Sequence, residues 1–227
     1  TKYQPLAELI SQAVGKPVVV VPAREFSTLE AGMKSNQYDF VMARPSDYPA
    51  RGLRDYKYRF IASTLPDGQC YLIVPKDSPI KTLSEAKGKR IVMPEKVAYM
   101  SRFCTAALRD EGINLQNEKV MYAREQGAVG FLLENKLGDV GGVASYSGIA
   151  KKWEKEGHRV IYKSAPRPYA PLVASNRVTP EQIKAIQKQL QALDPASATD
   201  GVIKATGAKG FDTSSEQRLR DLLKWLG

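Results

Sequence analysis

The residues best suited to chemistry in this sequence are polar and aromatic side chains that follow short apolar segments. Arginine offers forked N–H donors to a carboxylate or another oxyanion, and aromatic rings offer flat walls. In open α/β sheets, ligand-contacting residues lie where strands end and helices begin. The positions that satisfy this rule, and that we expect to bind a ligand, are Arg24, Phe26, Arg44, Ser46, Gln69, Tyr99, Ser101, Arg124, Glu125, Ser145 and Tyr146.

Several of these residues have a second role that the sequence leaves open. Phe26 could pack in the core, and Arg44 could form a surface ion pair. Glu125 either accepts from an amine or hydroxyl, or stabilises the start of a helix by its charge. Tyr99 and Tyr146 either wall the ligand or pack at the rim of the cleft.

Motifs of enzyme catalysis are absent from the sequence. It contains no Gly-x-Ser-x-Gly elbow, no phosphate loop and no His-Glu-x-x-His pair. Gly138, Gly141 and Gly142 do not form a dinucleotide fingerprint, and His158 has no acid–base partner at a suitable spacing. We therefore expect a binding protein and not an enzyme, with no catalytic residue, no metal site and no cofactor.

Alternating helices and strands must position the candidate residues. A stripe of apolar residues predicts a helix over 5–14, and the run of valines at 17–21 is typical of a parallel strand buried on both faces. A helix over 27–35 and a strand over 39–43 follow. Strands at 58–64 and 70–74 are predicted as a pair, because Pro66-Asp67-Gly68 is a turn signal.

A second α/β block is predicted to follow residue 89, with a proline-rich crossover at 165–171 after it. Two amphipathic helices, over 181–193 and 215–226, complete the chain. Within the second block, the predicted strands and helices alternate over 90–93, 99–111, 119–122, 126–135, 140–143 and 158–162.

The predicted fold is two doubly wound α/β lobes joined by a two-segment hinge, near 74–78 and 164–171. Residues 1–75 and 170–227 form the discontinuous first lobe, and residues 76–169 form the second. Closure of the lobes by hinge motion would trap a small molecule in the cleft.

Composition restricts the partners of the chain. Lys and Arg number 34 against 24 acidic residues, but they are mixed with acids along the whole chain, and no nucleic-acid-binding motif is present. We expect no nucleic-acid partner and a monomer. No apolar stretch is long enough to span a bilayer and no signal segment follows Thr1, so we expect a soluble mature region.

The two cysteines, Cys70 and Cys104, are too few for a structural zinc site. They could be buried, bridged or in contact with a ligand. Because the predicted boundaries place them in different lobes, a bond between them would restrain hinge closure. We therefore expect two free thiols.

Short segments spread along the chain match the pattern of one known family. They are Tyr3-Gln4-Pro5-Leu6-Ala7-Glu8-Leu9, Gly15-Lys16-Pro17-Val18, Asp39-Phe40-Val41-Met42 with Pro45, Leu72-Ile73-Val74, Asp77-Ser78-Pro79-Ile80, Lys87-Gly88-Lys89-Arg90-Ile91, Gly138-Asp139-Val140-Gly141, Ser145-Tyr146 and Ser164-Ala165-Pro166. Through them the sequence resembles the periplasmic phosphonate-binding proteins, within the type 2 periplasmic binding fold, over nearly its whole length. The resemblance implies a periplasmic (extracytoplasmic) solute-binding protein that serves a membrane permease of an ABC transporter.

The sequence departs from the family pattern in the pocket and at its start. Where the family has a hydroxyl-rich Ser-Thr-Ser-Gly-like stretch that holds the phosphonate, this chain has Val97-Ala98-Tyr99-Met100-Ser101, and Glu125 stands where the family has a pocket histidine. These changes predict weak phosphonate binding and a carboxylate or other small oxyanion as ligand. The family's first strand is also missing, so the sequence is either truncated or lacks that strand.

Two other functions use the same fold and stay open at this stage. One is the periplasmic ligand-sensing domain of a signalling protein, whose partner would be a membrane-bound sensor. The other is the effector domain of a transcription regulator. A following transmembrane helix or an upstream helix-turn-helix in the full gene product would identify them.

Overall fold

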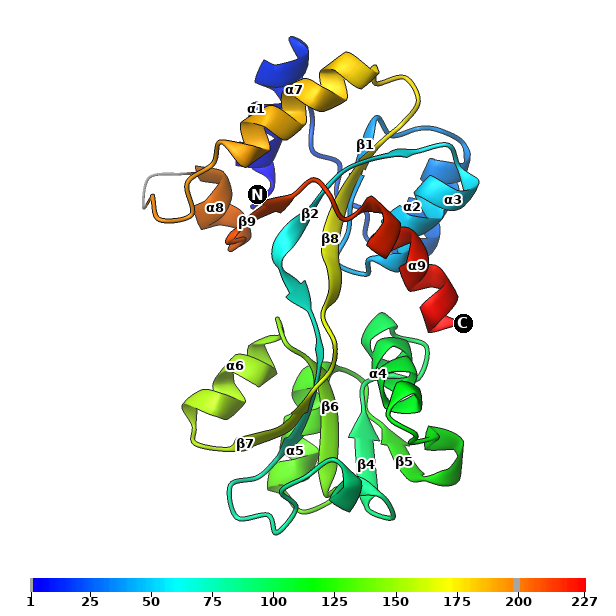
Figure 1. The fold of residues 1–227 in the computed structure, drawn as a ribbon, viewed down its shortest axis with the longest axis vertical. Coiled ribbons are helices and arrows are strands. Elements are labelled where there is room, and N and C mark those ends of the chain that lie inside the picture. Colours follow the sequence, from blue (N-terminus) through cyan, green and yellow to red (C-terminus); the bar gives the residue numbers. More distant parts are fainter. Residues whose placement is uncertain (1, 198–200) are drawn as a thin grey trace. The chain divides into compact units, whose positions relative to one another are not determined.

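The computed structural model describes residues 2–197 and 201–227, which form a mixed α/β protein (Figure 1). The chain divides into two compact units. Unit 1 comprises Thr1–Asp67 and Pro168–Lys224, and unit 2 comprises Gly68–Arg167 with Trp225–Gly227. Among the described residues, no helix has the length and apolar character needed to cross a membrane.

Unit 1 is built around a sheet with the strand order β1-β8-β2-β9. β1 pairs antiparallel with β8, with Phe40 opposite Ala174 and Met42 opposite Leu172. Its elements are α1 (Gln4–Val14), α2 (Phe26–Lys34), β1 (Phe40–Met42), α3 (Asp47–Asp55), β2 (Arg59–Gly68), β8 (Arg167–Ala174), α7 (Pro180–Gln191), α8 (Gly201–Thr206), β9 (Gly210–Asp212) and α9 (Glu216–Leu226).

Local signals set several helix ends in unit 1. α1 has a proline in its first turn and ends at Gly15, whose φ of 73° is the left-handed conformation that glycine adopts readily. α7 starts with a capping box between Thr179 and Gln182. The apolar faces of both helices then meet in one core, which contains Leu6, Ile10, Ile186 and Leu190.

Unit 2 is built around a sheet with the strand order β5-β4-β6-β3-β7. β4 pairs in parallel with both β5 and β6, whereas β3 runs antiparallel to its two neighbours. Its elements are β3 (Cys70–Val74), η1 (Ser84–Ala86), β4 (Arg90–Met93), α4 (Tyr99–Asp110), η2 (Leu115–Asn117), β5 (Lys119–Tyr122), α5 (Gln126–Glu134), β6 (Val140–Ala144), α6 (Gly148–Lys155) and β7 (Arg159–Lys163).

Two glycines in β6 explain how helices cover both faces of this sheet. A Cβ on Gly141 would lie 2.5 Å from Val129 of α5, and one on Gly142 would lie 2.5 Å from Met93 and 3.4 Å from Cys104 of α4. Successive strand residues point to opposite faces, so α5 and α4 lie on opposite faces of the sheet. These glycines therefore serve close packing, and the expected α/β architecture is confirmed.

The prediction of two free thiols is wrong. Cys70 and Cys104 form a disulfide with 5.3 Å between their Cα atoms, and neither residue has exposed surface. Cys70 begins β3, which pairs with β6 and β7 of unit 2, and α4 carries Cys104 over the same sheet. The chain enters unit 2 at Gly68, whereas the sequence predicted this boundary after residue 75. The prediction therefore assigned the two cysteines to different lobes, although both lie in unit 2.

Two strand predictions are also wrong. Pro66-Asp67-Gly68 lies inside β2, and β2 and β3 belong to different sheets instead of forming a pair. The valine run at 17–21 has no strand pairing, and Val19 and Val21 are 80% and 65% exposed. β-branched residues favour extended backbone, but a strand also needs a partner edge.

Candidate functional site

In unit 1, the loop after β1 presents Arg44 to solvent. The next polar residue, Ser46, is buried, and its hydroxyl donates to the carbonyl of Pro168 at 3.1 Å and to that of Arg44 at 3.3 Å. Ser46 therefore holds the Arg44 loop against the start of β8. This hydroxyl has an internal structural role instead of the ligand contact that we expected.

Arg44 lies close to a second cation, Lys2, and to the phenol of Tyr169. Burial, and then the charge of Arg44, lower the pKa of Lys2. Burial raises the pKa of Tyr169, and the Arg44 guanidinium opposes part of that rise. The phenol of Tyr169 thus keeps its proton and lies close to a guanidinium. Sequence reasoning missed Tyr169, because it falls in the proline-rich crossover that was read as a connection.

Phe26 and Arg44 both line one cavity of unit 1, which has a volume of about 450 Å³. Phe26 is the first residue of α2, and its ring stacks on Tyr48 at a centroid distance of 5.0 Å. Its exposure of 52% leaves part of the ring open to the cavity. Arg24 lies in the exposed segment before α2 and does not line this cavity.

In unit 2, the loops after β4, β5 and β6 gather at one edge of the sheet because these strands are parallel neighbours. The amide of Ala123 donates to the carbonyl of Met93 at 2.7 Å, which joins the first two loops. The side-chain oxygen of Gln126 accepts from the amide of Ala144 at 2.6 Å, which joins the second and third. No sequence motif indicated this role of Gln126.

The loop after β4 leads into α4, which begins at Tyr99. Tyr99 is half-buried, contacts the ring of Phe103 edge-on and lies beneath the guanidinium of Arg102. Ser101 is buried, and its hydroxyl donates to the carbonyl of Pro94 at 2.7 Å. Like Ser46, it braces its own loop. Val97, which precedes the helix, is 73% exposed.

Arg124 and Glu125 are both exposed in the loop after β5. Glu125 occupies the N-cap position of α5 without a side-chain capping bond. Its Oε1 lies over the first turn, 3.2 Å from where a Cβ on Gly127 would be. The carboxylate therefore interacts with the positive end of the helix and stays accessible from solvent.

The remaining candidates lie where β3 begins and β6 ends. The backbone amide of Gln69 donates to the hydroxyl of Ser145 at 3.0 Å, and the amide of Ser145 donates to the carbonyl of Gln69 at 2.9 Å. The Gln69 side-chain amide donates to the carbonyl of Ser164 at 2.7 Å. Tyr146, next in the chain, is half-buried. Unit 2 thus brings Gln69, Ser145 and Tyr146 together.

One group of possible metal ligands lies away from these loops, at Glu134, Glu156 and His158. Both glutamates are exposed, and Nδ1 of His158 accepts from the amide of Lys76 at 3.0 Å. The imidazole also stacks on Trp153. These contacts give His158 a structural role, and we do not include the group in the candidate site.

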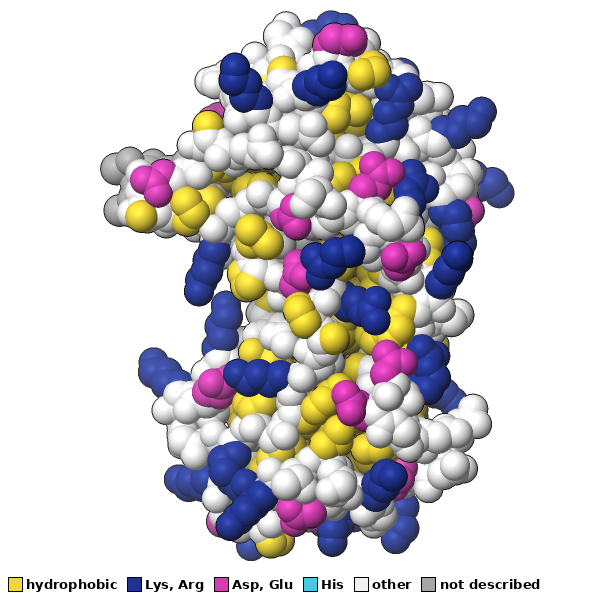
Figure 2. Space-filling view, viewed as in Figure 1, with side chains coloured by type: hydrophobic (Ala, Val, Ile, Leu, Met, Phe, Trp, Pro, Cys, Tyr) yellow, Lys and Arg dark blue, Asp and Glu magenta, His cyan; other side chains and the backbone are white. Residues whose placement is uncertain are grey.

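The face of the molecule seen in Figure 2 has no large patch of one charge that would indicate another binding site. Lys and Arg side chains are spread over that face with Asp and Glu between them. The arrangement in each unit can bind a small polar molecule but offers no nucleophile with an adjacent base.

Solved structures share this fold. XAC2383 from Xanthomonas citri bound to ATP matches with a TM-score of 0.74 and 17% identity, covering 99% of this chain and 92% of that chain. PhnD1 from Prochlorococcus marinus in complex with methylphosphonate matches with a TM-score of 0.72 and 12% identity, covering 99% and 90%. A binding protein component of an ABC phosphonate transporter from Pseudomonas aeruginosa gives 0.65 and 17%, covering 99% and 79%.

No curated protein matches the sequence. The family model described as "ABC transporter, phosphonate, periplasmic substrate-binding protein" matches residues 1–219. Members of this family are extracytoplasmic transport proteins that bind a substrate for a membrane permease, so the prediction of a binding protein and not an enzyme is confirmed. The chain belongs to the phosphonate-binding family of periplasmic ABC transporter substrate-binding proteins.

Proposed function

We propose that the chain captures a small ligand with one singly charged oxyanion, such as a carboxylate, and an amine or hydroxyl, and that simple phosphonates bind it weakly. The proposed ligand contacts come from Arg44 and Phe26 of unit 1 and from Tyr99, Glu125 and Tyr146 of unit 2. The proposal includes closure of two lobes on the ligand, and we take these lobes to be units 1 and 2, so that the disulfide lies within one lobe.

The observation that carries this proposal is that the Ser101 hydroxyl is buried and already hydrogen-bonded. A phosphonate dianion is best held by several hydroxyl and backbone donors at a helix amino end. In α4 the hydroxyl of Ser101 is buried and already donates to Pro94, and the residues before the helix, Val97 and Ala98, supply no side-chain donor. The helix start can therefore offer backbone N–H groups but few other donors to an anion.

The charges of the candidate residues support the same ligand class. Arg44 supplies a forked cation in unit 1, close to Lys2 and Tyr169. Glu125 supplies an exposed carboxylate in unit 2, which repels a dianion and attracts an amine. A ligand that carries an anionic and a donor group satisfies both residues, whereas a simple phosphonate satisfies only the first.

We expect amino acids and small hydroxy or amino carboxylates to raise the melting temperature of the protein, and methylphosphonate and phosphite to leave it nearly unchanged. A ligand that binds only the folded state stabilises it by mass action. Thermal-shift screening followed by calorimetry measures the effect. The Glu125→Gln variant should bind phosphonates more tightly than the wild type, because it removes the repulsion. Submicromolar binding of a simple phosphonate to the wild type would contradict the proposal.

Replacing Arg44 with glutamine is expected to weaken binding of the best ligand from that screen by about 10- to 100-fold, because a charge-assisted hydrogen bond is lost. Isothermal titration of both proteins measures the ratio. Arg54→Gln is the matched control, since Arg54 is exposed and pairs with its neighbour Asp55. Equal affinities of the Arg44→Gln and Arg54→Gln variants would exclude Arg44 from the site.

A further inference from the structure

A second cavity, which we call the basic groove, lies in unit 2 and has a volume of about 730 Å³. It is lined by α4, by residues 112–118 and by β5, the terminal strand of the unit 2 sheet in the described part of the chain. The candidate ligand residues, all of them described, lie outside its lining. Ligand sites in proteins usually have volumes of about 300 to 1,000 Å³, so the groove is large enough for a small molecule.

The side of α4 that borders the groove carries two arginines. Arg102, Thr105 and Arg109 recur at intervals of three and four residues, which places them on one face of the helix. Lys96, in the loop before the helix, adds a third cation to the same lining. The other side of α4 packs on the sheet, where Cys104 is fully buried. The helix is therefore buried on one side and cationic on the other.

Positive charge exceeds negative charge in the groove. Glu118 is the one carboxylate among the described lining residues, and its Oε2 already accepts from the amide of Gly88 at 2.9 Å. Next to the lining, Asp110 lies 3.9 Å from Nε of Arg109, but this carboxylate also accepts from the indole N–H of Trp225 at 2.6 Å. Three cations that face one cavity, with a single carboxylate that is already hydrogen-bonded, attract an anion.

Contacts within unit 2 hold these cations in place. The Lys96 ammonium lies 6.0 Å from the centre of the Tyr122 ring. Nη2 of Arg109 donates to the carbonyl of Trp225 at 2.7 Å, and Trp225 contacts the ring of Phe103 edge-on at 4.8 Å between ring centres. A guanidinium carries five N–H donors, so this bond leaves Arg109 with donors that an anion can use. Cations that are already positioned lose less conformational entropy on binding than mobile ones.

The length of the groove indicates what kind of anion it would bind. Arg102 and Arg109 lie two helical turns apart, about 10 Å along the axis of α4, and Lys96 precedes the helix. A ligand with a single anionic group contacts one end of such a row, whereas a ligand with several anionic groups can pair with cations along it. Asn114 and Gln116, also in the lining, add neutral amide donors that can bind oxyanion oxygens.

We propose that the basic groove is a second binding site of this protein, and that it takes a small molecule with two or more anionic groups, such as a polyphosphate or a polycarboxylate. The site is separate from the one proposed above, because its lining belongs to unit 2 alone and includes none of the described candidate residues. The two sites also differ in the charge that they favour. Glu125 repels a dianion at the candidate site, whereas the cations of the groove attract one.

Isothermal titration of the full chain at low ionic strength, with tripolyphosphate and with propane-1,2,3-tricarboxylate as probes, tests the proposal. We expect at least one probe to bind, as one molecule per chain. The Lys96→Gln/Arg102→Gln variant should bind that probe about tenfold or more weakly, since two charge-assisted contacts are lost. Tighter binding of tripolyphosphate would assign phosphate groups to the ligand, and tighter binding of the tricarboxylate would assign carboxylates. If neither probe binds, the proposal is wrong.

Two control variants separate the groove from general electrostatic attraction and from the candidate site. Lys151→Gln/Lys152→Gln removes the same charge from exposed positions of unit 2 outside the groove, so it should bind the probe as the wild type does. Arg44→Gln should also retain probe binding, because Arg44 belongs to unit 1. An equal loss in Lys151→Gln/Lys152→Gln would show that net charge alone attracts the probe, and a loss in Arg44→Gln would place the probe in the candidate site. Either result would overturn the proposal.

Discussion

The Cys70→Ala/Cys104→Ala variant is expected to lose about 3 to 4 kcal/mol of unfolding free energy relative to the oxidised protein. The disulfide joins residues separated by 34 positions, and closing a loop of this length removes conformational entropy from the unfolded chain. Urea denaturation followed by fluorescence measures the loss. Trp153 is a suitable probe, because it is fully buried in unit 2, the unit that contains the bond.

Reduction provides the control for this experiment. Reducing the wild type while it is unfolded in urea, where the bond is accessible, should shift its transition toward that of the double variant, and the double variant itself should not respond. If the oxidised wild type and the double variant unfold at the same urea concentration, the bond does not stabilise unit 2.

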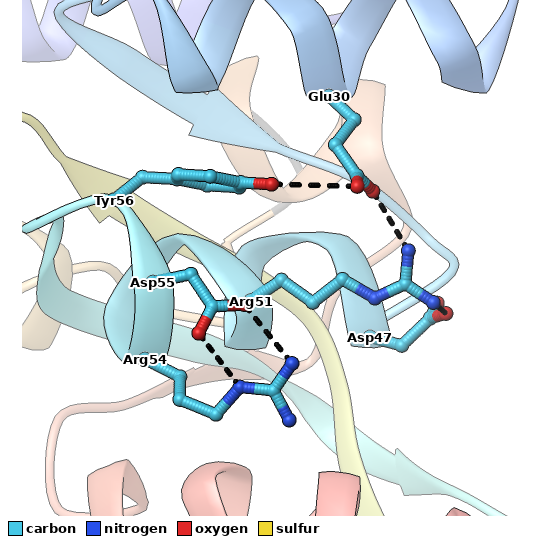
Figure 3. A network of polar contacts seen from close by, with 6 residues as sticks. All are labelled: Glu30, Asp47, Arg51, Arg54, Asp55 and Tyr56. Atoms are coloured by element: carbon cyan, nitrogen blue, oxygen red, sulfur yellow. Dashed lines mark hydrogen bonds and ion pairs between the residues drawn. The ribbon is translucent and has the colours of Figure 1, made fainter.

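The Arg51→Met variant is expected to lose about 2 to 4 kcal/mol of unfolding free energy. Asp47 opens α3 with a side chain that has no exposed surface, and Arg51 donates to it at 3.2 Å from one turn later. Arg51 also donates to Glu30 of α2 at 2.7 Å (Figure 3). Methionine keeps the apolar stem but takes the positive charge away from a buried carboxylate, which is costly in a low-dielectric site.

The neighbouring Arg54 supplies a matched control on the same helix. Arg54 pairs with Asp55 at 2.9 Å, but both side chains are well exposed (Figure 3). Exposed ion pairs contribute about 0 to 1 kcal/mol, so Arg54→Met should be close to neutral. Chemical denaturation of the two variants compares them directly. Equal losses for Arg51→Met and Arg54→Met would show that burial of Asp47 does not set the cost.

The parts of the fold that could be predicted from the sequence are those with local signals. The start of α7 was predicted because proline favours the first turn of a helix, as Pro180 does here, and the end of α1 because glycine is a helix stop, as Gly15 is. The alternation from β4 to β6 was predicted because each apolar strand is followed by an amphipathic helix. These signals act over a few residues and need no knowledge of distant partners.

The errors arose where distant partners decide the structure. The sequence predicted that Cys70 belongs to the first lobe, with the residues that precede it. Its strand, β3, instead pairs with β6 and β7, which come some 70 to 90 positions later in the chain. The Pro66-Asp67-Gly68 segment has turn composition, yet β2 continues through it and pairs with β9 nearby. Sequence patterns carry little information about such pairings.

For the candidate site, the sequence correctly predicted which loops of unit 2 lie together. It did not predict which side-chain atoms in the candidate residues are accessible to a ligand. The loops after β4, β5 and β6 lie at one sheet edge, as the strand-end rule requires. The hydroxyls of Ser46 and Ser101 were chosen as ligand contacts, but both are buried and donate to backbone carbonyls. Serine type and position alone do not distinguish a ligand donor from a residue that braces its own loop.

The buried disulfide also determines when the protein can reach its full stability during maturation. Reducing cellular compartments keep thiols free, so unit 2 would acquire its covalent brace only after the chain has left the cytosol. Once formed, the bond has no exposed sulfur for a small thiol to attack. Maturation would thus run in one direction, and protein made in a reducing host compartment would be a less stable molecule than the native one.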